Sequence, residues 1–353
     1  MSVKNISSAA ASIIKLFILI ILFSPNSKAQ DDNIKYYSDD KGILTLMYHR
    51  FNEPKYPSTN IQMDIFKKQI NIIDELKYKF YDPIEFEKNF FLPKKEKKIL
   101  ITIDDAFTSF YNNAWPFLKE KKIPFILFVS TEAVGKFGYM NWKQIKEIEK
   151  EEFAYIGNHS HSHDYLIEFS NKKFLDDINT SIEIFKNEIG YNPIYFSYPF
   201  GEYREYIKNY IKKKFKFSFG QHSGIIDVNK DIFELPRFPI NEKYGDLKRF
   251  KFLINLNTFQ FKKLMPEDKY LSSKNNPPSF YVEFFNDQNN IKNTNCYSNE
   301  GNKWKKSKTF ILDNISKIEF TEKFLPRRGR INCSLNDNGV WRWFGVQYSI
   351  KKN

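Results

Sequence analysis

Three of the five histidines of this chain lie in one short segment, Asn158-His-Ser-His-Ser-His163. His159 and His163 are four residues apart, a spacing that on one helical turn would let both imidazoles reach the same cation. His161 would then point away from them. Taken alone, the segment could also be a solvated surface loop, so metal binding needs a further source of ligands.

Two neighbouring carboxylates, Asp104 and Asp105, could be that source. They directly follow Lys98-Ile-Leu-Ile-Thr-Ile103, an apolar run typical of a buried strand. An aspartate here could simply cap a helix that starts near Ser109. Paired carboxylates at a strand end can instead divide two tasks, one binding a metal and the other acting as a general base. One aspartate and two histidines would leave positions on a divalent ion open for water and substrate, as in catalytic sites.

The elements that must position these residues alternate between strands and helices from Gly42 to about Ile240, a pattern that predicts an α/β domain with a parallel sheet. In such folds the loops that leave the carboxyl ends of the strands carry the chemistry. We predict strands at residues 43–48, 98–103, 125–129, 153–156, 194–197 and 215–219. We predict helices at residues 64–77, 141–151, 172–189 and 205–214, where apolar residues recur at intervals of three and four.

The pattern changes after Asp246. Residues 246–278 are predicted to be an irregular linker, whereas residues 279–353 alternate apolar and polar positions, as in a small all-β, sandwich-like domain. The strands of this second domain are predicted at residues 280–285, 309–312, 317–320, 330–333 and 341–349.

The only two cysteines, Cys296 and Cys333, fall in this second domain. In an exported protein they could form a disulfide, and two buried free thiols are the alternative. With no histidine near either of them, they make a poor metal site.

Trp304, Trp341 and Trp343 could form a platform that stacks on sugars, although alternating aromatic residues more often fill a core. Trp341 and Trp343 share one face of a strand, so that face is predicted to be buried.

Residues 1–29 have the features of a signal peptide, because two lysines precede the apolar run 16–23 and small residues follow it. Cleavage is predicted after Ala29. The run is shorter than the roughly 20 residues of a membrane-spanning helix, so a retained anchor is the less favoured alternative, and no later segment could span a bilayer. Residues 30–41 would form an N-terminal linker. The protein would be exported to the periplasm, the cell surface or the medium.

The formal net charge of +13 could indicate an anionic partner such as nucleic acid. The lysines are spread along the chain, however, within a composition rich in Lys, Asn, Ile, Phe and Tyr that AT-rich coding favours. No nucleic-acid-binding motif accompanies them. We therefore predict no nucleic-acid partner.

The aspartate and histidine motifs, taken together, are highly specific for one family of enzymes. Thr102-Ile-Asp-Asp-Ala106 and His159-Ser-His-Ser-His163 resemble the Thr-Phe-Asp-Asp-Gly and His-Ser/Thr-x-x-His motifs of the polysaccharide deacetylases of carbohydrate esterase family 4. The third motif of that family, which ends in Pro-Tyr, resembles Phe196-Ser-Tyr-Pro-Phe-Gly201. The resemblance covers roughly residues 42 to 240, in a deacetylase domain predicted at residues 42–245. It implies a distorted (β/α) barrel.

The resemblance also implies roles for single residues. Asp104 would be the general base, while Asp105, His159 and His163 would hold one divalent metal ion, zinc before other ions. The backbone amide of Phe200 would stabilise an oxyanion. A metal-bound water would attack the acetamide carbonyl of an N-acetylated polysaccharide of the N-acetylglucosamine type, with a polysaccharide or oligosaccharide as the partner.

Three positions depart from the family pattern. Ala106 replaces the usual Gly, Phe200 replaces the usual Tyr, and the arginine that often opens the third motif is absent. Arg237, in Glu234-Leu-Pro-Arg237, is predicted to replace that arginine as the partner that orients Asp104.

The general acid is displaced as well. No Leu-x-His motif follows near the end of the barrel, but Leu46-Met-Tyr-His-Arg50 occurs at its start. This arrangement resembles the circularly permuted members of the family, including the poly-N-acetylglucosamine deacetylases of exopolysaccharides, where an N-terminal histidine is the acid. His49 is predicted to be the acid, and His222, in Gly220-Gln-His-Ser-Gly224, is its competitor. Either histidine could instead make only a structural hydrogen bond.

Two alternative functions stay open on the sequence. Ala106 and the missing arginine are compatible with a carbohydrate-binding protein whose catalysis is weakened. The same site could also hydrolyse an O-acetyl ester on a glycan, since both reactions use the same water, metal and oxyanion groups. A nucleophilic serine is disfavoured, because no Gly-x-Ser-x-Gly segment is present.

Overall fold

The computed structural model describes residues 39–285, 288, 290–325 and 327–350. The predicted signal peptide, residues 1–29, lies outside these residues, as does most of the linker predicted to follow it. Within the described part of the chain, no helix is both long and apolar enough to cross a membrane.

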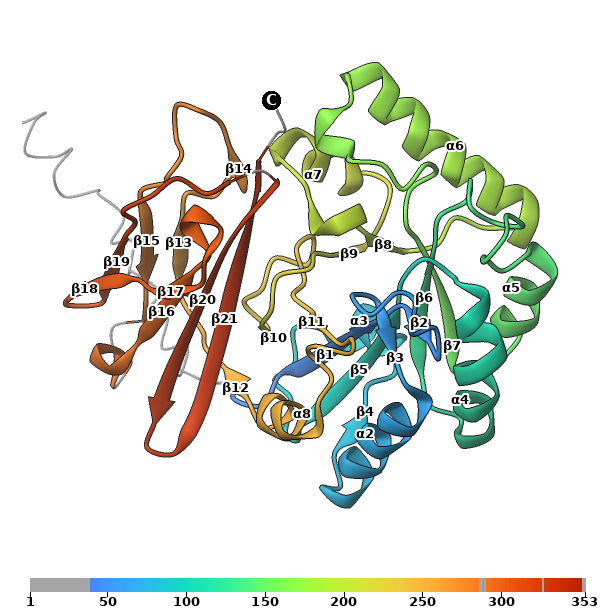
Figure 1. Cartoon of the computed structure of the whole chain (residues 1–353), viewed down its shortest axis with the longest axis horizontal. Helices are drawn as coiled ribbons and strands as arrows, with labels where there is room; N and C mark the ends of the chain where they lie inside the picture. The colour runs from blue at the N-terminus through green and yellow to red at the C-terminus, as the bar shows by residue number, and fades with distance from the viewer. Residues whose placement is uncertain (1–38, 286–287, 289, 326, 351–353) are drawn as a thin grey trace, which may run out of the picture. The chain divides into compact units, whose positions relative to one another are not determined.

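A nine-stranded sheet, curled into an incomplete barrel, forms the larger part of the molecule (Figure 1). Its central strands are parallel and follow one another in the order β1 (Ile43–Tyr48), β5 (Lys98–Ile103), β6 (Phe125–Val129), β7 (Ala154–Asn158), β8 (Tyr195–Ser197) and β9 (Phe217–Phe219). Two short parallel strands join them, β4 (Lys79–Phe80) on β5 and β11 (Phe238–Pro239) on β1, while β10 (Ile225–Ile226) pairs antiparallel with β1. The predicted α/β fold with a distorted barrel is confirmed.

Helices lie around this sheet (Figure 1). They are α2 (Met63–Glu75), α3 (Glu85–Asn89), α4 (Trp115–Lys121), α5 (Trp142–Glu149), α6 (Asn171–Ile189), α7 (Glu205–Ile211) and α8 (Leu247–Ile254). A capping box starts α5, because Asn141 and Gln144 each accept a hydrogen bond from the backbone of the other. Helix α6 ends at Gly190, whose φ of 86° suits a left-handed cap.

Both faces of the central strands are covered. In β5, Ile99, Ile101 and Ile103 belong to the core that the helices complete, whereas Leu100 lies in the cluster inside the barrel. A parallel strand buried on both faces reads as a continuous apolar run, which is the pattern that predicted β1, β5 and β6.

The segment 246–278, predicted to be a linker, is folded. It begins with α8, which Asp246 caps by accepting a hydrogen bond from the backbone N–H of Arg249. It continues with β12 (Asn257–Thr258), β13 (Lys263–Met265) and β14 (Tyr270–Leu271). Strands β12 and β14 pair with β21, and β13 pairs with β15. Strands of two or three residues carry too little periodicity to be predicted, so only their partners in the sheets define them.

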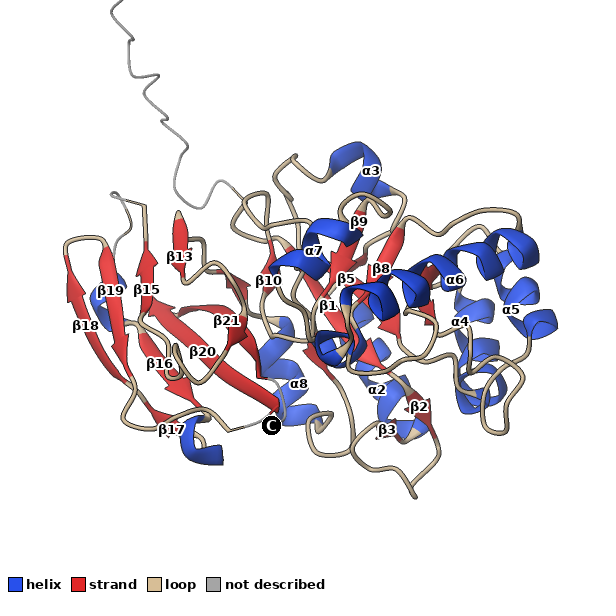
Figure 2. Cartoon of the chain, turned by 90° about the horizontal axis from the view of Figure 1, so that it is seen from above, coloured by secondary structure: helices blue, strands red, loops and turns tan. Residues whose placement is uncertain are grey.

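The C-terminal region consists of two sheets that share one core (Figure 2). The first has the order β12-β21-β20-β16-β17, with β14 also on β21, and the second has the order β13-β15-β19-β18. The remaining bounds are β15 (Phe280–Glu283), β16 (Asn295–Ser298), β17 (Lys305–Lys306), β18 (Lys308–Leu312), β19 (Ile315–Glu319), β20 (Arg327–Asp337) and β21 (Val340–Ile350). The all-β character predicted for this region is confirmed.

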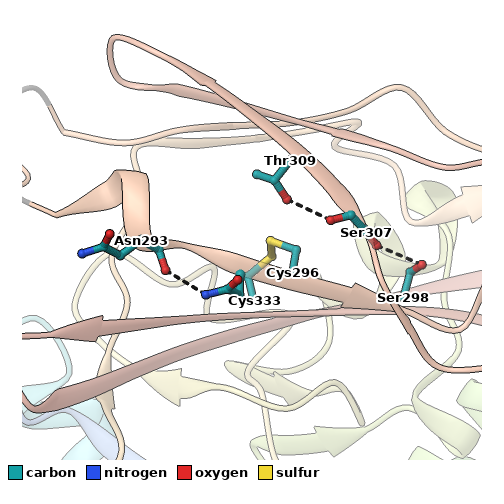
Figure 3. The surroundings of a disulfide bond; sticks show 7 residues. Asn293, Cys296, Ser298, Ser307, Thr309 and Cys333 are labelled. Carbon is teal, nitrogen blue, oxygen red and sulfur yellow. Dashed lines mark hydrogen bonds between the residues drawn. A yellow bond between two sulfur atoms is a disulfide. The ribbon is translucent and has the colours of Figure 1, made fainter.

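Cys296 on β16 and Cys333 on β20 lie opposite each other in register and form a disulfide (Figure 3). Both residues are buried in the core of the C-terminal sheets. Next to them, Ser307 donates a hydrogen bond to Ser298 across the sheet, at 3.1 Å between the two hydroxyl oxygens. The predicted disulfide is confirmed, and the alternative of two free thiols is wrong.

Only some of the aromatic residues of β21 lie in the C-terminal core. Phe344, Val346 and Tyr348 point into that core, so the alternate residues Trp341 and Trp343 lie on the opposite face. Trp343 packs against the core that the helices of the deacetylase domain complete, and Trp341 is 39% exposed. The prediction of one buried face for both tryptophans is therefore wrong for Trp341.

Removing the disulfide should destabilise the C-terminal region without preventing its folding. The bond closes a loop with a sequence separation of 37, for which the loss of chain entropy in the unfolded state predicts about 3–4 kcal/mol. We expect the Cys296→Ser/Cys333→Ser variant to lose that much unfolding free energy in urea titrations, and reduction of the unaltered protein to give the same loss. Equal midpoints for the oxidised and reduced proteins would contradict this estimate.

Candidate active site

The carboxyl ends of four strands of the parallel sheet, β1, β5, β7 and β8, place most of the predicted functional residues at one edge of the sheet. Tyr48, the last residue of β1, pairs with Ile103, the last residue of β5. The backbone N–H of Asp104 donates to the carbonyl of Tyr48 at 2.9 Å, and that of His159 donates to Val129 at 2.9 Å. Residues that directly follow β1, β5, β7 and β8 therefore meet here, as the parallel topology requires.

The three residues predicted to bind a metal lie together. The Nε2 atom of His163 is 3.1 Å from Oδ1 of Asp105, and Nε2 of His159 is 3.5 Å from the same oxygen. One ligand atom from each residue lies within 4.8 Å of the other two. Two nitrogens and one carboxylate oxygen at these distances could share one divalent ion.

The two histidines come together in a loop and not on the helical turn that their four-residue spacing would also allow. Ser160 and His163 have φ angles of 69° and 55°, in the left-handed region. The carboxylate of Asp177 on α6 accepts the backbone N–H groups of His161 and Ser162, each at 3.0 Å. The side chain of His161 points elsewhere, with Nδ1 at 2.9 Å from the hydroxyl of Thr131. The loop conformation, rather than the four-residue spacing, aligns His159 with His163.

The chemistry of these donors fits a metal ion. Nδ1 of His159 lies 2.7 Å from the carbonyl oxygen of Ser197, which can only accept, so Nδ1 carries the proton and Nε2 offers a lone pair. Burial lowers the pKa of His159 to about 4, which keeps the imidazole neutral at pH 7. Among the described residues, neither His159 Nε2 nor Asp105 Oδ1 has a hydrogen-bond partner, although both atoms are buried. Buried polar atoms without partners are costly, and a bound cation would satisfy both.

The neighbouring histidines favour the ionised form of Asp105. Burial acts to raise the pKa of Asp105, but the nearby histidines, with His163 contributing most, outweigh it, so the pKa lies well below its ordinary value. In return, Asp105 outweighs the effect of burial on His163 and raises the pKa of that imidazole. Asp105 is therefore anionic at neutral pH.

Asp104 lies next to the three candidate ligands and is fully buried. Arg237 binds its carboxylate with two nearly parallel bonds, 2.6 Å from Nη1 to Oδ1 and 2.9 Å from Nη2 to Oδ2. Burial acts to raise the pKa of Asp104, but Arg237 and the nearby histidines outweigh it and hold that pKa below its ordinary value. The Oδ2 atom is 3.8 Å from Nε2 of His159. An ionised carboxylate thus stands next to the candidate metal site.

Residues 92–216 match the family described as polysaccharide deacetylase. The chain carries a polysaccharide deacetylase domain. Over 268 residues it is 25% identical to the poly-beta-1,6-N-acetyl-D-glucosamine N-deacetylase of Staphylococcus aureus. The match covers 65% of this chain and 92% of that protein.

Solved structures show the same fold. The deacetylase PplD of Streptococcus pyogenes superposes with a TM-score of 0.55 at 23% identity, covering 60% of this chain and 98% of that one. IcaB from Ammonifex degensii superposes with a TM-score of 0.53 at 24% identity, covering 61% of this chain and 97% of that one. At these identities the likeness concerns the fold of the deacetylase domain.

His49 and His222 occupy different places in the deacetylase domain. His49 follows β1 at the edge of the sheet that holds the site, and its charge contributes to lowering the pKa of both Asp104 and Asp105. His222 instead lines a separate cavity of about 280 Å³, together with Tyr203, Glu234 and residues of the C-terminal sheets. Burial lowers the pKa of His222 to about 4. The geometry therefore favours His49 over His222 as a group that can reach the site.

Phe200 lies in the loop between β8 and α7, with a left-handed φ of 59°. Its ring stacks on Tyr165 at a centroid distance of 4.2 Å and meets the ring of His163 at 4.8 Å. The loop that carries the Phe200 amide therefore borders the candidate metal ligands.

Sequence reasoning missed the groups that hold Arg237. Its guanidinium also donates to Thr102 Oγ1, to Ser197 Oγ and to the carbonyl of Gly220. A threonine inside the apolar strand β5 and a serine at the end of β8 were the available signals, since polar side chains buried at strand ends need partners.

Truncating Arg237 should leave Asp104 buried without a counter-charge. We expect Arg237→Ala to cost about 3–5 kcal/mol of unfolding free energy at pH 7. The deficit should shrink as the pH falls toward 4, because protonation of Asp104 then removes the unpaired charge. Urea titrations at several pH values would measure both effects.

A double-mutant cycle gives the control for this prediction. Adding Asp104→Asn to Arg237→Ala should recover part of the loss and abolish its pH dependence. The same arginine truncation at Arg342, which is also buried and pairs with Asp40 and Asp337 away from the site, should not be rescued by Asp104→Asn. Equal behaviour of the two arginine variants would contradict a specific pairing with Asp104.

Proposed function

We propose that this protein is a metal-dependent N-deacetylase that removes acetyl groups from a polysaccharide of the N-acetylglucosamine type. The observation that carries the proposal is the convergence of Asp105, His159 and His163 beside the ionised carboxylate of Asp104. The name of the Staphylococcus aureus relative supports the class of sugar.

Asp105, His159 and His163 would hold the metal, and their donor set suits Zn²⁺ while admitting other divalent ions. A divalent ion in this place would supply a Lewis acid and lower the pKa of water. The residues of the chain would do the rest of the work. Asp104 would take the proton of the attacking water, and the two bonds from Arg237 to its carboxylate support this role by keeping it charged and oriented.

Two further groups would complete the reaction. The backbone N–H of Phe200 would donate a hydrogen bond to the oxygen of the acetyl group as negative charge develops on it. His49 would give a proton to the departing amine.

The contact between Arg237 and Asp104 argues against the alternative of a carbohydrate-binding protein with weakened catalysis, because the arginine absent from the third motif has a substitute.

We further propose that the protein acts outside the cytoplasm, with residues 1–29 as its signal peptide. The disulfide between Cys296 and Cys333 supports this location, since such bonds persist mainly in oxidising compartments.

Two aspartate variants should separate metal binding from proton transfer. Asp105→Ala should lose both bound metal and acetate release, because it removes the anionic ligand. Asp104→Asn should keep the metal while acetate release falls by about 10²–10⁴-fold, the usual contribution of a general base. Metal content by mass spectrometry and acetate release from N-acetylated and O-acetylated glycans, before and after chelation, would test both.

Chelation should abolish acetate release from the unaltered protein, and added Zn²⁺ should restore it. Acetate release at the unaltered rate by Asp105→Ala would end the proposal. Release from O-acetylated glycans alone would change the bond that is cleaved but not the site.

The two histidine candidates can be separated in the same assay. We expect His49→Gln to lower kcat by about 100-fold or more, because a neutral amide cannot protonate the leaving amine. His222→Gln should keep kcat within about threefold, since its ring lies in another cavity. The alkaline limb of the dependence of kcat on pH, where a general acid loses its proton, should persist in His222→Gln. The reverse ranking of the two variants would assign the acid to His222.

A further inference from the structure

One face of β21 lies against the deacetylase domain instead of in the C-terminal core. Trp343 donates its indole N–H to the hydroxyl of Ser223 at 2.8 Å. A side chain at Gly345 would come within 2.5 Å of the carbonyl of Ser223, so the two backbones approach closely here. Gln347 and Ser349 continue this row, because alternate residues of a strand share a face.

Gln347 reaches the loop that carries Phe200. Its side chain is 3% exposed, and its amide nitrogen donates to the carbonyls of both Phe200 and Gly201, each at 3.0 Å. Its amide oxygen accepts from Nε of Arg330 at 3.1 Å. Arginine can only donate, so the amide oxygen must face Arg330 and the NH₂ group must face the loop.

The next two residues of the loop are held from the same side. The backbone N–H of Tyr203 donates to the hydroxyl of Ser349 at 3.0 Å. Glu202 is fully buried, and its Oε1 lies 3.5 Å from Nε of Arg328 on β20. Four consecutive residues, 200–203, thus contact side chains of the C-terminal sheets.

This loop needs such support because its backbone is strained. Phe200 and Gly201 both have left-handed φ angles, 59° and 67°. Glycine is required at the second position, where a Cβ would come within 2.5 Å of the backbone nitrogen of Gln221. Phe200 has a side chain and therefore adopts this conformation only when its surroundings impose it.

We propose that Gln347 is a positioning residue of the deacetylase site and that the C-terminal β region is part of the catalytic unit. The inference rests on the proposed function, in which the Phe200 N–H donates to the developing oxyanion. Pro199 restricts the backbone before Phe200, and Gln347 fixes the two carbonyls after it. Together these constraints set the direction of the Phe200 N–H.

Gln347→Glu tests this role with little change of shape, because a carboxylate cannot donate to the two carbonyls. We expect kcat to fall by about 10- to 100-fold, as for a misaligned oxyanion donor, with KM within about twofold. Metal content should be unchanged. Hydrogen exchange of the backbone amides of residues 200–203 should become faster, measured by mass spectrometry on the full chain. Gln347→Ala should behave in the same way.

Asn332→Asp is the matched control. Asn332, on β20, accepts a hydrogen bond from the hydroxyl of Ser223 at 2.9 Å. This variant also changes an amide to an acid, but at a residue whose hydrogen bond lies outside the loop of residues 199–203. We expect kcat within about twofold of the unaltered protein and unchanged exchange in residues 200–203.

The outcomes separate this inference from the proposed function. Unchanged exchange of residues 200–203 in Gln347→Glu would overturn the positioning role, whether or not acetate is released. Faster exchange with an unchanged kcat would overturn its catalytic consequence. If the unaltered protein releases no acetate from any acetylated glycan, the proposed function fails, and the catalytic role of Gln347 fails with it.

A variant that does not fold would be replaced by Arg330→Met, which removes the donor that orients the Gln347 amide and should give a smaller fall in kcat. An unchanged kcat in that variant would also count against the role.

Discussion

The buried pairing of Arg237 with Asp104 is the interaction on which the rest of the site depends. Neither charge could remain in the interior without the other. The guanidinium makes five hydrogen bonds, to Asp104 twice and to Thr102, Ser197 and Gly220, so all five of its N–H groups are used. It therefore ties β5, β8 and the segment after β9 together. Ser197 extends this link, because its hydroxyl accepts from Arg237 while its carbonyl orients His159. One arginine thus sets the candidate base and a candidate metal ligand relative to each other.

Much of the sheet could be predicted from the sequence, because its strands are buried on both faces. The bounds of β1, β5 and β6 follow directly from their apolar runs. The aspartate and histidine motifs could also be found, since each lies in a short segment after such a strand. The parallel topology then brings the two segments to the same edge. What local sequence could not supply was the shape of the histidine loop, which depends on Asp177 in a helix further along the chain.

Contacts between distant segments account for the other misses. Strands β12, β13 and β14 are too short to show periodicity and exist only through their partners in the C-terminal sheets. The two faces of β21 are both rich in large side chains, so alternation alone did not tell which face meets the C-terminal core and which meets the barrel. The bonds from Gln347 to Phe200 and Gly201 span nearly half of the chain, and no motif marks either end. Such contacts follow from the packing of whole elements.

The backbone of the site explains why it needs so many supports. Asp105, Ala106, His163 and Phe200 all have left-handed φ angles, between 52° and 74°. Each such residue costs about 1–2 kcal/mol, and together they approach the net stability of a typical domain. The conformation of Ala106 also gives a reason for the glycine that is usual at this place in the family, since glycine adopts it without strain. Four strained residues can persist only where the framework over-determines them. Here Arg237, Asp177 and Gln347 each fix a different segment of the site, and they come from three distant parts of the chain.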